Sequence, residues 1–125
     1  MKKHLFVFCY ETPEQLATNP MYGWDEEESK AMFIKCESED AALHWGRKAA
    51  QEYVRALFER EGAPAGLQWV PNRYAHWVEP NPSSLLTPGE MEDLPAIKIG
   101  QFLDNPEPSP LPSLRLAVQR LSSAR

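Results

Sequence analysis

A long amphipathic segment in the middle of the chain constrains the fold most, and it predicts a helix over residues 39–61. Ser38 precedes it as a helix N-cap, and Gly62 follows as the residue that ends it. Acidic Glu39 and Asp40 occupy the first turn, where the helix dipole favours carboxylates. Apolar side chains recur at helical spacing, namely Ala42, Trp45, Ala49, Ala50, Tyr53, Val54, Leu57 and Phe58. A helix with such a broad apolar face must bury it, and we expect it to cover a β-sheet.

Short β-rich runs on both sides of this helix predict the strands of that sheet. Residues 5–10 are apolar on both faces and should form a central strand, whereas residues 32–36 are apolar mainly on one face. The runs 67–70 and 74–79 suit a hairpin or a kinked edge strand. A last strand is expected over residues 96–102, with its isoleucines pointing inward.

Proline and glycine mark the connections between these elements. Residues 11–23 are predicted to be a long connection with at most one helical turn, around residues 14–18. Residues 81–95 are a loop by composition. The segment before the second strand stays open between loop and helix, because Asp25 with Glu28 three residues later is also the pattern of a helix cap.

Length and composition favour one folded domain of the α+β class. The chain has 125 residues, the usual size of a domain, and 42% of them are hydrophobic. We expect a single domain over residues 1–104, with a mainly antiparallel sheet of four or five strands and the long helix packed on one face. Residues 105–125 are expected to form a proline-rich arm and a short C-terminal helix, beginning near Pro112 and packed on the same domain.

The sequence gives few signs of secretion or membrane insertion. Two lysines precede the apolar run 5–10, as in a signal peptide, but the run is short and no small-residue cleavage pattern follows it. No run approaches the length of a membrane span. Cys9 and Cys36 predict two buried free thiols in place of a disulfide framework. We therefore expect a cytoplasmic protein that does not bind membranes.

The negative charge of the protein is concentrated in one part of the sequence. The formal net charge is −5, and residues 25–40, with seven acidic and two basic side chains, account for all of it. An acidic protein repels a phosphate backbone, so nucleic acid is not an expected partner. A basic protein is, because complementary charge steers protein association.

No short motif of a known catalytic chemistry occurs in the sequence, which has no glycine-rich phosphate loop, GxSxG, HExxH or CxxC. We expect no cofactor and no bound metal. One alternative is a small enzyme or small-molecule binder whose site lies on a sheet face near Cys9, Cys36 and His76. Another is a Mg²⁺ or acid–base site pairing one of residues 26–28 with Glu37 or Asp40.

The leading expectation is a non-catalytic protein that binds a basic partner through an acidic surface. Trp24 lies in a turn region and is the tryptophan best placed for exposure, so it can anchor a contact between acidic neighbours. The expected partner-binding residues are Trp24, Asp25, Glu26, Glu27, Glu28, Glu39 and Asp40. In size, acidity and low cysteine content the chain resembles bacterial immunity proteins, which neutralise a cognate toxin. That resemblance implies an inhibitor or immunity-type protein, of an oligomeric state that the sequence leaves open.

Overall fold

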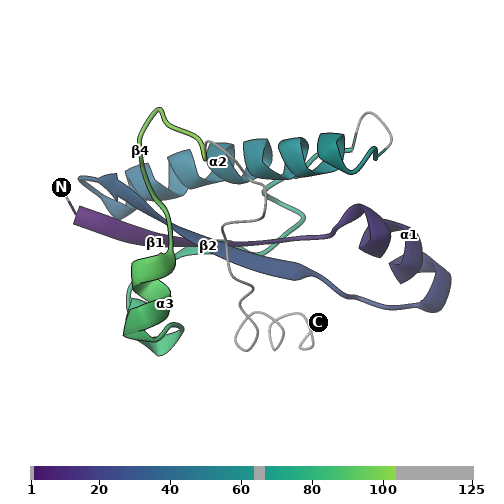
Figure 1. Ribbon diagram of the computed structural model, residues 1–125, viewed down its shortest axis with the longest axis horizontal. Helices are drawn as coiled ribbons and strands as arrows, with labels where there is room; N and C mark the ends of the chain where they lie inside the picture. Colours follow the sequence, from purple (N-terminus) through teal and green to yellow (C-terminus); the bar gives the residue numbers. More distant parts are fainter. Residues whose placement is uncertain (1, 64–66, 104–125) are drawn as a thin grey trace.

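The computed structural model describes residues 2–63 and 67–103 as a sheet with one long helix lying across it (Figure 1). The α+β class and the long helix are confirmed. The elements in chain order are β1 (Lys2–Tyr10), α1 (Pro13–Tyr22), β2 (Glu28–Cys36), α2 (Glu39–Arg60), β3 (His76–Glu79), the 3₁₀ helix η1 (Pro82–Ser84), α3 (Pro88–Asp93) and β4 (Ala96–Lys98).

The sheet has four strands in the order β3-β1-β2-β4, and its strand directions are mixed. β1 runs antiparallel to both β2 and β3, whereas β4 pairs in parallel with β2. The expectation of a mainly antiparallel sheet is therefore wrong. The reason is the connection after β3: the chain passes through η1 and α3 on the side of the sheet away from α2, and enters the edge beside β2 in the same direction (Figure 1).

β1 is the central strand, as its two apolar faces predicted. It pairs with β2 along its whole length and with β3 over residues 5–8. Phe6 and Phe8 lie on the face beneath α2, where Phe8 meets Tyr53 edge to face with ring centroids 5.7 Å apart. Leu5 and Val7 point to the other face and are fully buried. Burial on both faces explains why this strand has almost no polar side chain after His4.

α2 begins and ends where the sequence predicted. The Ser38 hydroxyl accepts a hydrogen bond of 3.1 Å from the Ala41 amide, and Gly62 follows the helix with a φ of 70°, in the left-handed region that glycine favours. Gly46 lies directly over the Phe6 ring, so closely that a Cβ at this position would overlap the ring. The absence of a side chain at Gly46 thus sets how near the helix can approach the sheet.

Two segments predicted to be loops contain helices. α1 covers Pro13–Tyr22 and α3 covers Pro88–Asp93, and each starts with a capping box, formed by Thr12 with Gln15 and by Thr87 with Glu90. In each box the threonine hydroxyl and the glutamine or glutamate side chain satisfy amides that a helix start leaves without partners. The prediction of at most one turn at residues 14–18 is wrong because this local pairing outweighs the breaking effect of Pro20.

The strands also differ from expectation at their ends. β2 begins at Glu28, four residues before its predicted start, which settles the open choice at residues 28–31 in favour of a strand. Residues 67–70 form no strand, because Trp69 instead inserts into the core and its indole N–H donates to the Cys9 carbonyl at 2.7 Å. In the last strand Ile97 is buried as predicted, but Ile99 follows the strand end and is exposed.

The predicted proline-rich arm and C-terminal helix at 105–125 lie outside the described residues, so that expectation stays a prediction. Among residues 2–63 and 67–103, none of the helices combines the length and apolar character needed to cross a lipid bilayer.

We predict that Gly46→Ala lowers the free energy of unfolding by up to about 2 kcal/mol. Alanine is the better helix former by about 1 kcal/mol, but the new methyl group would be forced into the fully buried Phe6 ring, and such overpacking costs about 1–3 kcal/mol. Urea denaturation measures the change. Gly89→Ala is the matched control, because a Cβ there meets nothing within 4 Å. Equal stability of the two variants would contradict the close approach of α2 to β1.

Candidate functional site

The structure separates the predicted partner-binding residues into two groups. Residues 24–28 lie at the start of β2, whereas Glu39 and Asp40 lie at the start of α2, directly after its end. The nine residues of β2 place the groups about 26 Å apart. The predicted pairing of residues 26–28 with Glu37 or Asp40 in a metal or acid–base site fails for the same reason.

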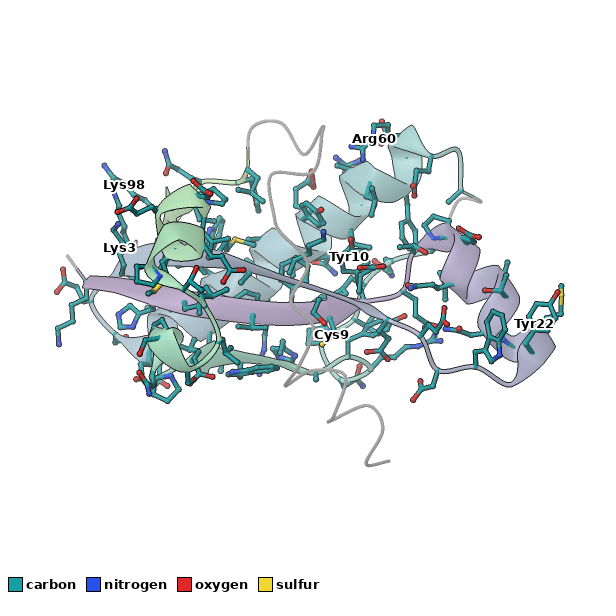
Figure 2. All side chains as sticks on the ribbon, turned by 60° about the horizontal axis from the view of Figure 1, so that its bottom comes forward. Lys3, Cys9, Tyr10, Tyr22, Arg60 and Lys98 are labelled. Atoms are coloured by element: carbon teal, nitrogen blue, oxygen red, sulfur yellow. The ribbon has the colours of Figure 1, made fainter. Side chains whose placement is uncertain are left out.

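Trp24, Asp25 and Glu26 of the first group belong to a loop of residues 19–26, here called the recognition loop, in which α1 ends and the chain turns toward β2. Glu27 and Glu28 follow this loop and are half-buried, and Glu28 is the first residue of β2. Three large apolar side chains are exposed in it: Met21 (69%), Tyr22 (58%) and Trp24 (51%). The Tyr22 and Trp24 rings stack, with centroids 4.6 Å apart and an interplanar angle of 26°. Figure 2 shows Tyr22 at one tip of the molecule, opposite the end that carries Lys3 and Lys98.

The end of α1 creates this loop. Gly23 adopts a φ of 67°, and its N–H donates to the Asn19 carbonyl. The Trp24 N–H donates to the same oxygen at 2.9 Å. This left-handed cap reverses the chain within a few residues and turns Trp24 back against Tyr22. The exposure predicted for Trp24 is confirmed.

The Asn19 side chain closes the recognition loop from the inside. It is only 5% exposed, and its carboxamide pairs with the backbone of Glu26: Nδ2 donates to the Glu26 carbonyl at 2.9 Å and Oδ1 accepts from the Glu26 N–H at 3.3 Å. Nδ2 also donates to Oε2 of Glu11 at 2.7 Å. Because both the NH₂ group and the oxygen of the Asn19 carboxamide are bonded to Glu26, they hold the two ends of the loop together.

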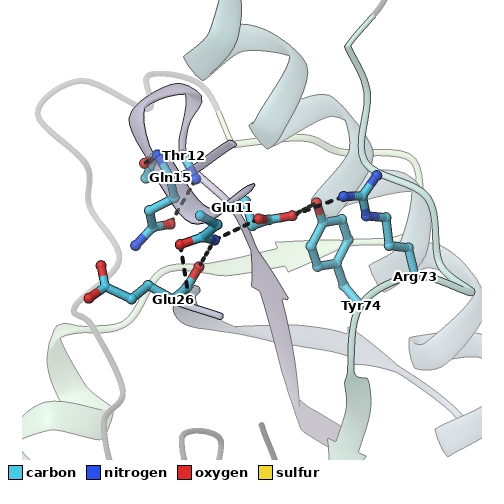
Figure 3. A network of polar contacts seen from close by, with 7 residues as sticks. Glu11, Thr12, Gln15, Glu26, Arg73 and Tyr74 are labelled. Carbon is cyan, nitrogen blue, oxygen red and sulfur yellow. Dashed lines mark hydrogen bonds and ion pairs between the residues drawn. The ribbon is translucent and has the colours of Figure 1, made fainter. Parts of the chain in front are cut away.

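Glu11 links this loop to the rest of the protein. The other carboxylate oxygen of Glu11, Oε1, accepts a hydrogen bond of 2.8 Å from the Tyr74 hydroxyl (Figure 3). The same oxygen forms an ion pair with the Arg73 guanidinium, whose Nη2 lies 3.3 Å away. Tyr74 precedes β3, so the carboxylate ties α1 to the far edge of the sheet. Burial and the neighbouring Glu11 carboxylate both raise the pKa of Tyr74, because they disfavour its ionised form.

Sequence reasoning missed most of this arrangement. Asn19 was interpreted as part of an Asn-Pro turn, and Met21 and Tyr22 were given no role. One available signal was the Thr12–Gln15 capping pattern, which predicts a helix that ends near Gly23 and so places Tyr22 and Trp24 on either side of its cap. No local pattern signals Glu11, because its partners Arg73 and Tyr74 come from a distant segment.

Cys9, Cys36 and His76 do not come together on one sheet face. Cys9 points away from α2 with Leu5 and Val7, whereas His76 lies beneath α2 beside Phe6, with ring centroids 6.2 Å apart. Cys36 pairs with Lys2, at the opposite end of β1 from Cys9. The two thiols are thus separated by seven strand positions as well as by the sheet itself, and the alternative site that requires them to meet loses its basis.

His76 has structural partners instead. The Arg47 Nε–H group donates to its Nε2 at 2.9 Å, which requires the other ring nitrogen, Nδ1, to carry the proton. Nδ1 lies 2.9 Å from the Tyr74 carbonyl, a suitable acceptor for that proton. The imidazole therefore joins α2 to β3, and both of its nitrogens are engaged in this connection.

A buried polar group lies beneath the C-terminal half of α2, where the Lys30 ammonium comes from β2. Burial lowers the pKa of Lys30, and the Glu28 carboxylate partly opposes that effect. Burial also raises the pKa of Tyr10, whose hydroxyl bonds to Tyr53 on the helix. The bond between Tyr10 and Tyr53 gives the buried hydroxyl of Tyr10 a partner in the interior, where a polar group without one would be costly.

Two hollows can be assessed as ligand sites. One, of about 40 Å³, lies beside the Glu11 network between Trp69 and Phe58 and is far smaller than the roughly 300 Å³ at which small-molecule pockets begin. The other, of about 320 Å³, opens beside β4 and has no ionisable or nucleophilic side chain in its lining, which consists of Pro95, Ala96, Ile97, Gln101, Phe102 and Leu103. The first hollow has ionisable groups in its lining but is too small for a substrate, and the second has the volume but lacks such groups.

We predict that Asn19→Ala lowers the free energy of unfolding by about 1–3 kcal/mol, because the Glu26 amide and a Glu11 oxygen lose a buried partner. Hydrogen exchange of the Glu26 amide should accelerate at the same time. Thr18→Ala is the control, since it removes a single exposed hydrogen bond on the same helix. Unchanged exchange at Glu26 in Asn19→Ala would show that the side chain does not hold the loop closed.

A second prediction concerns alkaline pH. As the pH rises through about 10, tyrosines of the unfolded chain lose their protons, while folded Tyr74 keeps its own because its pKa is raised. The unfolded state is thereby favoured, so the free energy of unfolding should fall above that pH. Denaturant titrations across this range should show a smaller fall for Tyr74→Phe. An identical fall in the variant would contradict the burial of this hydroxyl against Glu11.

Comparison with models of known protein families gives no match, and no curated protein and no solved structure matches the chain either. The function has to be inferred from the recognition loop itself.

Proposed function

We propose that this protein is a non-catalytic cytoplasmic binding protein that recognises a basic partner protein through the recognition loop, in the manner of an inhibitor or immunity-type protein. The observation that carries the proposal is the exposed Tyr22–Trp24 stack, which is followed directly by the exposed acids Asp25 and Glu26. Cys9 and Cys36 are buried and form no disulfide, which fits a reducing compartment.

The apolar side chains of the loop favour a protein contact. Large aromatic residues are enriched at the centres of interfaces, where they supply contact area at little cost in conformational entropy. Among the described residues, six large hydrophobic side chains are exposed, and three of them, Met21, Tyr22 and Trp24, lie within four positions of each other. Such local concentration distinguishes the loop from the scattered apolar residues of an ordinary surface.

The charge of the loop favours a basic partner. From Glu11 to Ser29 the sequence has no lysine, arginine or histidine, so the carboxylates of Asp25 and Glu26 have no neutralising residue next to them in the chain. A cationic surface approaching the loop would be attracted before contact, which raises the rate of association.

The buried support of the loop also favours recognition. Asn19 fixes the loop ends, and Glu11 connects it to the residues before β3. A loop already held in one conformation loses less entropy on binding, and more of the contact energy then becomes affinity.

We expect Asp25→Lys with Glu26→Lys to abolish capture of a basic protein from a lysate of the source cell. Glu39→Lys with Asp40→Lys is the matched control, because it makes the same change in net charge about 26 Å away. Retention by the wild type and the control, but not by the loop variant, supports the proposal. That binding should also weaken as salt is added.

Two results would contradict the proposal. Retention of the same proteins by all three forms would mean that the recognition loop is not the contact. Loss of binding in the Glu39 and Asp40 variant alone would move the contact to the start of α2.

A further inference from the structure

We propose, on the basis of the recognition function above, that the loop binds an arginine side chain of the basic partner. The guanidinium would stack on the outer face of the Tyr22–Trp24 ring pair and form an ion pair with the carboxylates that follow Trp24. The proposal thus narrows the partner from a basic protein to one that presents an exposed arginine at its contact surface.

The shape of the ring pair fits a planar cation. The two rings are stacked at 4.6 Å between centroids and cover each other's inner faces, but both side chains are more than half exposed, so a flat cation can lie against an outer face of the pair. Figure 2 shows Tyr22 at the tip of the molecule. The face of an aromatic ring carries negative electrostatic potential and attracts a cation that lies over it, most strongly for tryptophan.

Comparison with other rings of the same protein supports this reading. In the described part of the chain, three aromatic rings are each approached by a cation of the chain itself, in the pairs Lys3–Phe33, Lys48–Trp45 and Arg73–Tyr74, at 5.5–5.9 Å from the ring centroid. No such contact is found there for Tyr22 or Trp24, although both are more exposed than Phe33 and Tyr74. Within residues 2–63 and 67–103, the outer faces of this ring pair thus meet no cation, which fits binding of a cation from another molecule.

The adjacent carboxylates favour arginine over lysine. A guanidinium is planar and can stack on a ring while its N–H groups form two parallel hydrogen bonds to a carboxylate. Asp25 and Glu26 directly follow Trp24, and both are exposed. A lysine ammonium is a more strongly hydrated point charge that can use the ring or the carboxylate less well at the same time.

The test titrates the full-length protein, labelled with ¹⁵N, with an arginine-rich peptide and records the Trp24 indole N–H signal, identified by its loss in Trp24→Leu. Two further peptides have the same sequence with lysine or with neutral citrulline in place of every arginine. We expect the arginine peptide to shift the signal, the lysine peptide to bind several-fold more weakly, and the citrulline peptide to have no effect.

Two variants separate the ring from the charge. Trp24→Leu keeps an apolar side chain and both acids, and it should weaken binding of the arginine peptide by about 5-fold through loss of the cation–π contact. Asp25→Asn with Glu26→Gln should weaken it further, whereas the matched pair Glu39→Gln with Asp40→Asn should not. All three lie at exposed positions, so each variant can be checked for an unchanged melting temperature.

The outcomes distinguish this inference from the broader one. Equal affinity for the arginine and lysine peptides, or normal binding by Trp24→Leu, would overturn the arginine site; the acidic recognition surface would still stand if the Asp25 and Glu26 variant lost binding. No shift of the Trp24 signal with any peptide would also overturn the arginine site. The capture experiment with lysine variants would then decide on the recognition function by itself.

Discussion

The close approach of α2 to β1 at Gly46 and Phe6 is the contact on which the rest of the structure depends. With the helix this near, the stacked rings of Phe6 and Phe8 on β1 fill the space beneath it, and Phe8 meets Tyr53 of α2 edge to face. Trp69 completes this layer and bonds to the Cys9 carbonyl, which brings the segment before β3 against the end of β1. Tyr74 is thereby placed where its hydroxyl can reach Glu11.

The recognition loop is held in place by buried hydrogen bonds of Asn19, although its large apolar side chains are exposed to solvent. Exposed rings such as Tyr22 and Trp24 contribute little to folding, and a loop that presents them needs another source of order. Asn19 supplies it, since its buried carboxamide bonds to Glu11 and to the backbone of Glu26, and an open loop would leave these buried groups without partners. The buried side of this segment, with Asn19, therefore stabilises the loop, while its exposed side carries Tyr22 and Trp24.

The sequence predicted well those elements whose signals are local. Ser38 and Gly62 mark the ends of α2, and the two apolar faces of residues 5–10 identify a central strand. Local signals failed where two of them competed, as for the capping box at Thr12 against the breaker Pro20. They also failed where the outcome depends on distant partners: the parallel entry of β4 follows from its crossover through α3, and nothing near Trp69 in the sequence marks its place in the core.

The candidate site shows why charge along a sequence is a poor guide to a surface. Residues 25–40 contain the whole net charge, but β2 crosses the sheet between their acidic ends and carries Lys30 into the interior on the way. What remains at one tip is a small number of carboxylates beside two stacked rings. A few exposed carboxylates alone give long-range attraction without selectivity, whereas a ring pair rewards only a cation that can lie flat against it. The specificity of this protein would then come from Tyr22 and Trp24, and the acids would bring the partner to them.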